Sequence, residues 1–239
     1  MTVVLDQRAP QKAEEAFRRQ GFSVLRLPPH PALAPPVASH PDMLLFFSPE
    51  EILCTRAYAA VARQELEVLS RACGRPVHAV EAECGGDYPH DILLNTATVG
   101  KTRFCLPDFT AREIPEDTRF SVCAVKQGYA KCSTLPVGER ALITADPSIA
   151  RAARAAGLNV LQISSGEVEL TGYDTGFLGG ATSFAPYGRY DKIYFCGSLE
   201  RHSMGDAIRL FCLSHGYEPI SLFDGPLTDV GTMFLVEST

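Results

Sequence analysis

A glycine followed at fixed distances by two apolar residues recurs along the chain, and this repeat constrains the fold more than any other feature. In RRQGFSVLRL the glycine is Gly21, and Val24 and Leu27 follow it three and six positions later. The pattern is typical of a helix that ends at a glycine with positive φ and leads into a buried strand. Further copies start at Gly74, Gly157 and Gly216, and a weaker one starts at Asp117. Intervals of about 40 to 60 residues between copies predict a repeat protein.

Each unit also has two strand-like segments ahead of its helix. In three units the first segment follows an aspartate, at Asp42, Asp91 or Asp229. The second segment is clearest in ALITADPSIARAARAAG, where Asp146 is expected to cap a helix that begins at Pro147. The unit is therefore strand–strand–helix–strand.

The last unit is split between the two ends of the chain. The C-terminal VGTMFLV would pair with the N-terminal TVVLD. The sequence thus predicts one α/β domain over residues 1–239, a five-bladed α/β propeller of ββαβ units with pseudo-fivefold symmetry, closed by the N- and C-terminal strands. An ordinary open α/β sheet also fits the alternation. The extra strand in each unit and the head-to-tail closure, which leaves no free edge strand, favour the ring.

Charge and apolar composition narrow the classes of binding partner that this chain can have. There are 22 basic and 28 acidic residues, the net charge is −6, and no basic run occurs. Nucleic acid is therefore not expected as a partner, and a small-molecule ligand is favoured. The longest apolar runs, such as residues 43–47, are too short to cross a bilayer, and the N-terminus does not have the pattern of a signal peptide. We expect a cytoplasmic protein without a membrane partner, and the oligomeric state stays open.

The eight cysteines are expected to be free thiols, because the predicted domain is large and no export signal is seen. The closest pair, Cys123 and Cys132, lies nine positions apart, so no metal site built on close cysteine pairs is expected. Cys84 and Cys132 have polar neighbours, and their roles stay open.

Five such units around an axis resemble the pentein superfamily. This superfamily includes arginine deiminase, dimethylarginine dimethylaminohydrolase, the amidinotransferases and a non-catalytic ribosome-binding initiation factor. The segments YPHDILLN, KQGYAKCS and GFLGGA also resemble a group of uncharacterised bacterial proteins. The resemblance implies, for catalytic members, a cysteine nucleophile, a histidine and two carboxylates at one end of a central channel. They act on a guanidinium carbon without a cofactor.

The resemblance places the nucleophile in the closing C-terminal strand, where this chain has Thr232. This departure argues against ordinary deiminase or dimethylaminohydrolase chemistry. A second registration puts Cys132 in the equivalent position one blade earlier. His40 would then be its histidine, and Asp229 and Asp91 would supply carboxylates. A neighbouring cation would lower the pKa of the Cys132 thiol, whereas nearby aspartates would raise it.

Several candidate ligand-binding residues lie at corresponding strand starts. Three aspartates that face one another across the axis repel one another, so they need a cation, a proton or a basic partner. A lysine in the matching strand would be such a basic partner. A structural ion network or simple turn capping would explain the same aspartates. Two glycines would let the backbone pass close to the axis or to a ligand. The candidates are Asp42, Asp91, Asn95, Lys131, Gly179 and Gly180.

Two functions follow, and the sequence leaves open whether the chain is an enzyme. The first is binding of a small guanidine- or amidine-bearing metabolite in a polar central pocket, without standard pentein catalysis. The second is a pentein-type hydrolase or amidinotransferase with Cys132 as the nucleophile. Neither is expected to need a cofactor.

Overall fold

The computed structural model describes residues 1–188 and 190–237 of the chain, as α-helices, short 3-10 helices and mixed β-sheets. Three sheets share one pattern, in which an antiparallel pair is followed by a parallel third strand. They are formed by β3 (Phe46–Phe47), β4 (Ile52–Cys54) and β5 (Val77–Ala79); by β6 (Ala97–Val99), β7 (Thr102–Cys105) and β8 (Ser121–Ala124); and by β9 (Thr134–Pro136), β10 (Ala141–Thr144) and β11 (Asn159–Gln162). This pattern agrees with the predicted order of strands within a unit.

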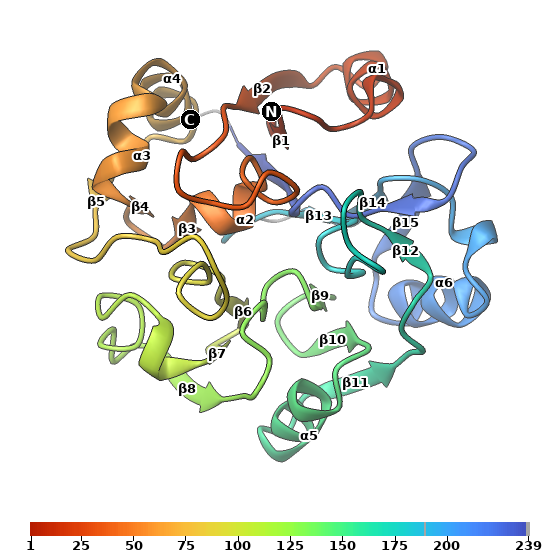
Figure 1. Cartoon of the computed structure of the whole chain (residues 1–239). Coiled ribbons are helices and arrows are strands. Elements are labelled where there is room, and N and C mark those ends of the chain that lie inside the picture. Colours follow the sequence, from red (N-terminus) through yellow and green to blue (C-terminus); the bar gives the residue numbers. More distant parts are fainter. Residues whose placement is uncertain (189, 238–239) are drawn as a thin grey trace.

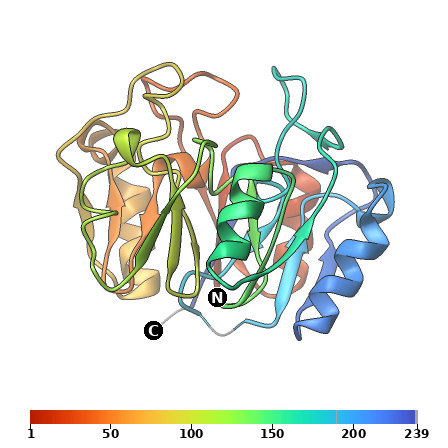
Figure 2. The same ribbon diagram turned by 90° about the horizontal axis from the view of Figure 1, so that it is seen from below.

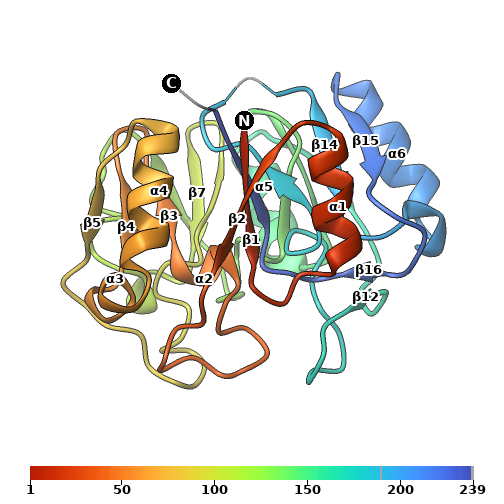
Figure 3. The same cartoon turned by 90° about the horizontal axis from the view of Figure 1, so that it is seen from above.

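The two ends of the described chain share one sheet. It contains β1 (Thr2–Asp6), β2 (Ser23–Leu27), β13 (Ser183–Phe184) and β17 (Met233–Val236), in the order β13-β17-β1-β2. β1 is antiparallel to β17, with Val3 opposite Leu235, and parallel to β2. The predicted pairing of the N- and C-terminal strands is therefore confirmed, and Figure 3 shows both ends on the same side of the molecule.

The unit before the C-terminal strand differs from the prediction. β14 (Lys192–Phe195) pairs in parallel with β15 (Glu218–Ser221), while β13 pairs with β17 and reaches β14 through one bridge, Thr182 to Phe195. Here the amide of Tyr194 donates to the hydroxyl of Ser183, at 2.9 Å, instead of to a backbone carbonyl. A further pair, β12 (Val168–Glu169) with β16 (Leu227–Thr228), also lies outside the predicted pattern. None of the sheets closes on itself within the described residues.

The longer helices lie at the periphery of the molecule, outside the strands (Figure 1). They are α1 (Gln11–Arg19), α3 (Arg56–Val61), α4 (Arg63–Cys73), α5 (Pro147–Ala155) and α6 (Gly205–Ser214). The side chain of Asp146 accepts the amide of Ile149 at 2.8 Å, so the predicted cap of α5 is confirmed. Between β7 and β8 the chain forms turns and a 3-10 helix (Pro107–Phe109) in place of an α-helix, where the repeat was weakest.

The predicted glycine endings are confirmed. Gly21, Gly74, Gly157 and Gly216 have φ values of 84°, 66°, 79° and 82°. A side chain is strained in this region, so glycine lets the helix end and the next strand begin within a few residues. No helix among the described residues has the length and apolar character that crossing a bilayer requires.

Five inner strands lie nearest the centre of the molecule: β3, β6, β9, β13 and β17. Seen from the side, long loops gather at one end of the molecule and the two termini lie at the other (Figure 2). β17 ends beside Thr2, so its carboxyl end is at the terminal end. The residues that precede the inner strands thus meet at the loop end, and this arrangement positions the site.

We predict that Leu235→Ala lowers the free energy of unfolding by about 2–5 kcal/mol, because the truncation leaves a cavity under β17. Leu235 is buried in the cluster that also contains Val3. Urea denaturation followed by circular dichroism measures the change. The control is Glu237→Ala at an exposed position just after β17, which should change stability by less than about 0.5 kcal/mol. Equal effects of the two substitutions would contradict the role assigned to β17.

Candidate functional site

Polar side chains from the starts of several inner strands meet at the centre of the molecule. Asp42 lies in the short helix α2 (Pro41–Leu44), ahead of β3. Asn95 and Cys132 lie two residues before β6 and β9, and Thr232 lies directly before β17. All four are buried, so their polar atoms must find partners within the protein.

The carboxylate of Asp42 is the acceptor at the centre of this group. Its Oδ2 accepts from the hydroxyl of Thr232 at 2.7 Å and from the thiol of Cys132 at 3.1 Å. The amide nitrogen of Asn95 in turn donates to the Cys132 sulfur at 3.2 Å. The other oxygen of Asp42, Oδ1, is buried and has no hydrogen-bond partner among the described residues. A buried acceptor without a partner is costly, so a donor from a ligand would stabilise this oxygen.

Lys131 lies beside this group and is almost fully buried. Its ammonium donates to Thr232 Oγ1 at 3.1 Å and lies 5.1 Å from the ring centre of Phe184. Burial lowers the pKa of Lys131 to about 8, although the charge of Asp42 acts in the opposite direction. Lys131 therefore lies near Asp42, as predicted. The two side chains are linked by hydrogen bonds to the Thr232 hydroxyl and not by a direct salt bridge.

The Cys132 thiol is held in its protonated form. Burial, and after it the charges of Asp42 and Asp229, raises the pKa of Cys132 well above its ordinary value. The expectation that a neighbouring cation lowers this pKa is wrong, because desolvation and two carboxylates outweigh Lys131. The other expectation from the sequence, that nearby aspartates raise the pKa of Cys132, agrees with the structure.

His40 and Asp229 lie on the loop-end side of the group. His40 Nδ1 is 3.9 Å from Asp229 Oδ1, and His40 Nε2 is 3.6 Å from Asp6 Oδ2. Burial raises the pKa of Asp229, while its carboxylate accepts the backbone amides of Phe177 and Gly231 at 2.9 and 3.0 Å. Asp229 is thus anchored by backbone donors, and His40 lies between two carboxylates.

Three groups come close enough together to be considered as metal ligands. A ring nitrogen of His40, a carboxylate oxygen of Asp42 and the sulfur of Cys132 lie within 4.8 Å of one another. Two of the three are bonded to each other, since the Cys132 thiol donates to Asp42 Oδ2 at 3.1 Å. We therefore assign Asp42 and Cys132 to the hydrogen-bonded group, and His40 lies beside it.

Asp91 takes a different place from the one predicted. Its Oδ2 accepts the hydroxyl of Tyr129 at 2.7 Å, and burial raises its pKa. The Tyr129 ring lies 5.4 Å from that of Tyr88 and 6.0 Å from that of Phe177. Asp91 is therefore bonded to this aromatic cluster and, among the described residues, not to the hydrogen-bonded group around Asp42.

Gly179 and Gly180 are required by close approach. A Cβ on Gly180 would lie 1.9 Å from Asp229 Oδ1, and one on Gly179 would lie 2.3 Å from the carbonyl oxygen of Thr134. The carbonyl of Gly179 also accepts from Thr232 at 3.1 Å. Both glycines therefore make room for the polar group, as the sequence indicated for the axis.

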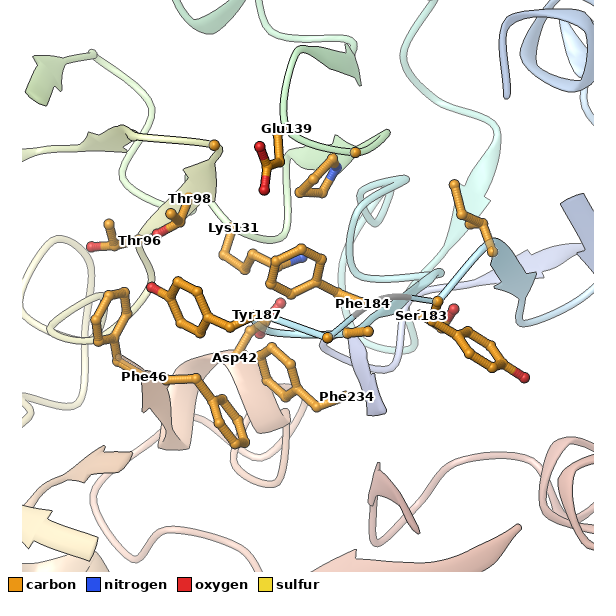
Figure 4. A pocket seen from close by; sticks show the side chains of 18 of the residues that line it. Asp42, Phe46, Thr96, Thr98, Lys131, Glu139, Ser183, Phe184, Tyr187 and Phe234 are labelled. Atoms are coloured by element: carbon orange, nitrogen blue, oxygen red, sulfur yellow. The ribbon is translucent and has the colours of Figure 1, made fainter. Parts of the chain in front are cut away.

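A cavity of about 290 Å³ reaches the polar group from the other direction (Figure 4). Asp42 and Lys131 are its buried residues with charged groups, and exposed residues such as Glu139 and Tyr187 form its rim. Residues that follow inner strands line this rim, so the cavity opens at the end of the molecule that carries the termini. Its walls are mainly aromatic rings and hydroxyls, from Phe46, Phe184, Phe234, Thr96, Thr98 and Ser183.

The proposed catalytic residues and this cavity do not coincide. Cys132, His40 and Asp229 are absent from its lining, whereas Asp42 and Lys131 are present. The sequence analysis missed the wall residues. A signal existed in the alternation of side chains along each inner strand, which directs every second residue toward the centre. Phe184 and Phe234, for example, are directly opposite each other on β13 and β17.

Comparisons with known proteins agree with this architecture. The citrulline complex of a dimethylarginine dimethylaminohydrolase variant from Pseudomonas aeruginosa aligns with a TM-score of 0.54 and 10% identity, over 92% of this chain and 91% of that one. Agmatine deiminase from C. jejuni aligns with a TM-score of 0.51 and 9% identity, over 92% and 86%. Both are members of the pentein superfamily, and at such low identity the likeness concerns the fold. The chain therefore has an α/β fold of the pentein type.

The sequence itself defines a narrower group. The chain belongs to the Family of unknown function (DUF6873), which it matches over residues 4–234. No curated protein matches it.

Substitution of Lys131 by methionine tests the charge at the centre. Folding moves the pKa of Lys131 from 10.5 down to about 8, so between these pH values the unfolded chain binds a proton that the folded protein has lost. The wild type should therefore gain stability relative to Lys131→Met as the pH rises, by up to about 1.4 kcal/mol per pH unit.

Urea titrations of both proteins from pH 7 to 10 measure this difference. Lys192→Met, at the partly exposed rim of the cavity, is the matched control for the loss of a lysine. A difference between Lys131→Met and the wild type that is independent of pH would contradict the lowered pKa.

Proposed function

We propose that the chain binds a small molecule with a guanidine or amidine head group in its central cavity, without standard pentein catalysis. The observation that carries this proposal is the Oδ1 oxygen of Asp42, which is buried, has no partner in the part of the chain that the structure describes, and belongs to a residue that lines the cavity. An N–H group of a planar nitrogen cation would satisfy it with a charge-assisted hydrogen bond.

The rest of the cavity supports a planar cation. Phe46, Phe184 and Phe234 offer ring faces, which attract a guanidinium by cation–π interaction. Lys131 competes with such a cation, but its pKa of about 8 means that a modest rise in pH or the arrival of the ligand removes its proton. Solved proteins of this fold are named for dimethylarginine and agmatine, both of which carry guanidine groups.

Three features disfavour catalysis of the standard kind. Thr232 occupies the place in the closing strand where the resemblance implies the nucleophile. The raised pKa of the Cys132 thiol favours its protonated form, the thiol donates to Asp42, and Cys132 does not line the cavity. A thiol in this state is a poor nucleophile, because the thiolate is the reactive form.

A second candidate is a hydrolase or amidinotransferase that uses Cys132. It is favoured by the approach of His40, Asp42 and Cys132 to within 4.8 Å of one another. A guanidinium that neutralised Asp42 and Asp229 would lower the pKa of the thiol and activate it. The route would run through the loop end, where the rings of Tyr88, Tyr129 and Phe177 would have to move.

We further propose that residues 1–239 form a single domain, a closed propeller of five blades. The three sheets of like pattern and the pairing of β1 with β17 support the ring, as does the arrangement of the inner strands around one centre. The excess of acidic residues supports a small-molecule ligand over nucleic acid, and we place the protein in the cytoplasm on the same sequence grounds.

Asp42→Asn should weaken the binding of agmatine or benzamidine by about tenfold or more, because a neutral amide replaces a charged acceptor. Isothermal titration calorimetry at pH 8 measures the change, and circular dichroism checks that the variant folds. The control is Asp108→Asn, an exposed position outside the cavity lining, which should leave the affinity unaltered. Undiminished binding by a folded Asp42→Asn variant would refute the assignment of the head-group acceptor.

Alkylation by iodoacetamide separates the two candidates. At pH 7.5 the partly exposed Cys73 and Cys123 should be modified well before Cys132, since Cys132 is buried and protonated. Peptide mass spectrometry over time gives the order. Early modification of Cys132 in the folded protein, together with ammonia release from agmatine that Cys132→Ser abolishes, would favour the enzyme instead.

A further inference from the structure

Lys131 has an unusual position for a lysine. It is 3% exposed and lines the closed part of the central cavity, whereas Lys192 lies at the partly exposed rim. Figure 4 shows its side chain beside Phe184 and Asp42. A molecule that fills the cavity would therefore meet the nitrogen of Lys131 in a setting with few competing water contacts.

The hydrogen bonds around Thr232 determine what the Lys131 nitrogen can do. The hydroxyl of Thr232 has one proton, which goes to Asp42 Oδ2 at 2.7 Å or to the carbonyl of Gly179 at 3.1 Å. In the contact between Lys131 Nζ and Thr232 Oγ1, at 3.1 Å, the lysine must therefore be the donor. When Lys131 is neutral, its lone pair is not consumed by Thr232 and is available to another group.

The same surroundings favour the neutral amine. Burial lowers the pKa of Lys131 to about 8, so a substantial fraction of the side chain is unprotonated slightly above neutral pH. Asp42, Cys132 and Asp229 are the titratable groups that influence it from the packed elements around it. A desolvated lysine with a lowered pKa in an apolar pocket is a nucleophile toward carbonyl carbon.

A proton carrier is also present. Asp42 lines the cavity together with Lys131, and within residues 1–188 and 190–237 its Oδ1 has no partner. The two side chains are joined through the Thr232 hydroxyl, which bonds to both. Asp42 can therefore take a proton from the attacking nitrogen and return it to the departing oxygen.

We propose that Lys131 is a nucleophilic amine that condenses with an aldehyde or ketone in the central cavity to form an imine. The nitrogen lone pair attacks the carbonyl carbon, and the electron pair of the C=O bond moves to the oxygen, which is protonated. The nitrogen then forms a double bond to carbon as the hydroxyl leaves with a proton as water. Amine and carbonyl thus become imine and water, with no oxidation or reduction. The reaction uses Lys131, Asp42 and the cavity, so this proposal does not depend on the proposal that the cavity binds a guanidine.

Reductive trapping with propanal tests the proposal. The folded protein is treated with propanal and sodium cyanoborohydride at pH 7.5, which reduces any imine to a stable secondary amine, and peptides are mapped by mass spectrometry over time. Lys131 should be modified about tenfold or more faster than Lys12, Lys101, Lys126 and Lys192, because its neutral fraction is larger.

Two variants complete the test. Lys131→Arg should remove the fast adduct, and Lys192→Arg should leave it, since only the former changes the buried amine. Modification of Lys192 or of surface lysines ahead of Lys131 in the folded wild type would overturn the proposal. Because the measurement uses an aldehyde and the wild-type chain, its failure is distinct from a failure of agmatine binding at Asp42.

Discussion

The carboxylate of Asp42 joins parts of the chain that are far apart in sequence. Through Thr232 and Cys132 it connects the short helix α2 to the starts of β17 and β9. Hydrogen bonds to a charged group contribute roughly 1.5–3 kcal/mol each when they replace water, and a buried carboxylate without them would be costly. The carboxylate of Asp42 therefore fixes the starts of β9 and β17 relative to α2, because it cannot easily exchange its donors for water.

Polar and aromatic side chains divide the centre into two compartments. At the loop end lie Cys132, His40 and Asp229, and there Tyr129 also contacts Phe177 and bonds to Asp91. At the terminal end, aromatic walls and hydroxyls lead down to Asp42 and Lys131. Asp42 belongs to both compartments, since its Oδ2 accepts from the Cys132 thiol and the residue also lines the cavity. A ligand in the cavity would thus change the charge that Cys132 experiences without touching the sulfur, because the two groups share one carboxylate.

The repeat made the order of strands predictable, but features that depend on how side chains pack were not predictable from the sequence. Glycine at Gly21, Gly74, Gly157 and Gly216 predicted the helix endings, because a positive φ leaves few other choices. The weak link between β13 and β14 was not predictable, since the amide of Tyr194 bonds to a side chain, the hydroxyl of Ser183, in place of a backbone carbonyl. Proximity of Asp42, Lys131 and Cys132 followed from equivalent positions in the repeat. The state of the thiol did not, because desolvation is a property of the packed structure.

The placement of β17 between β1 and β13 has a consequence for how the chain is made. β1 leaves the ribosome before β17, so one of its two neighbours is not synthesised until residues 233–236 emerge. At about 5–20 residues per second this delay is roughly 10 to 50 seconds. During that time Val3, Val4 and Leu5, all fully buried in the finished fold, lack their cover on one side. During synthesis β1 is therefore an apolar strand with an unpaired edge, a kind of surface that is prone to aggregation.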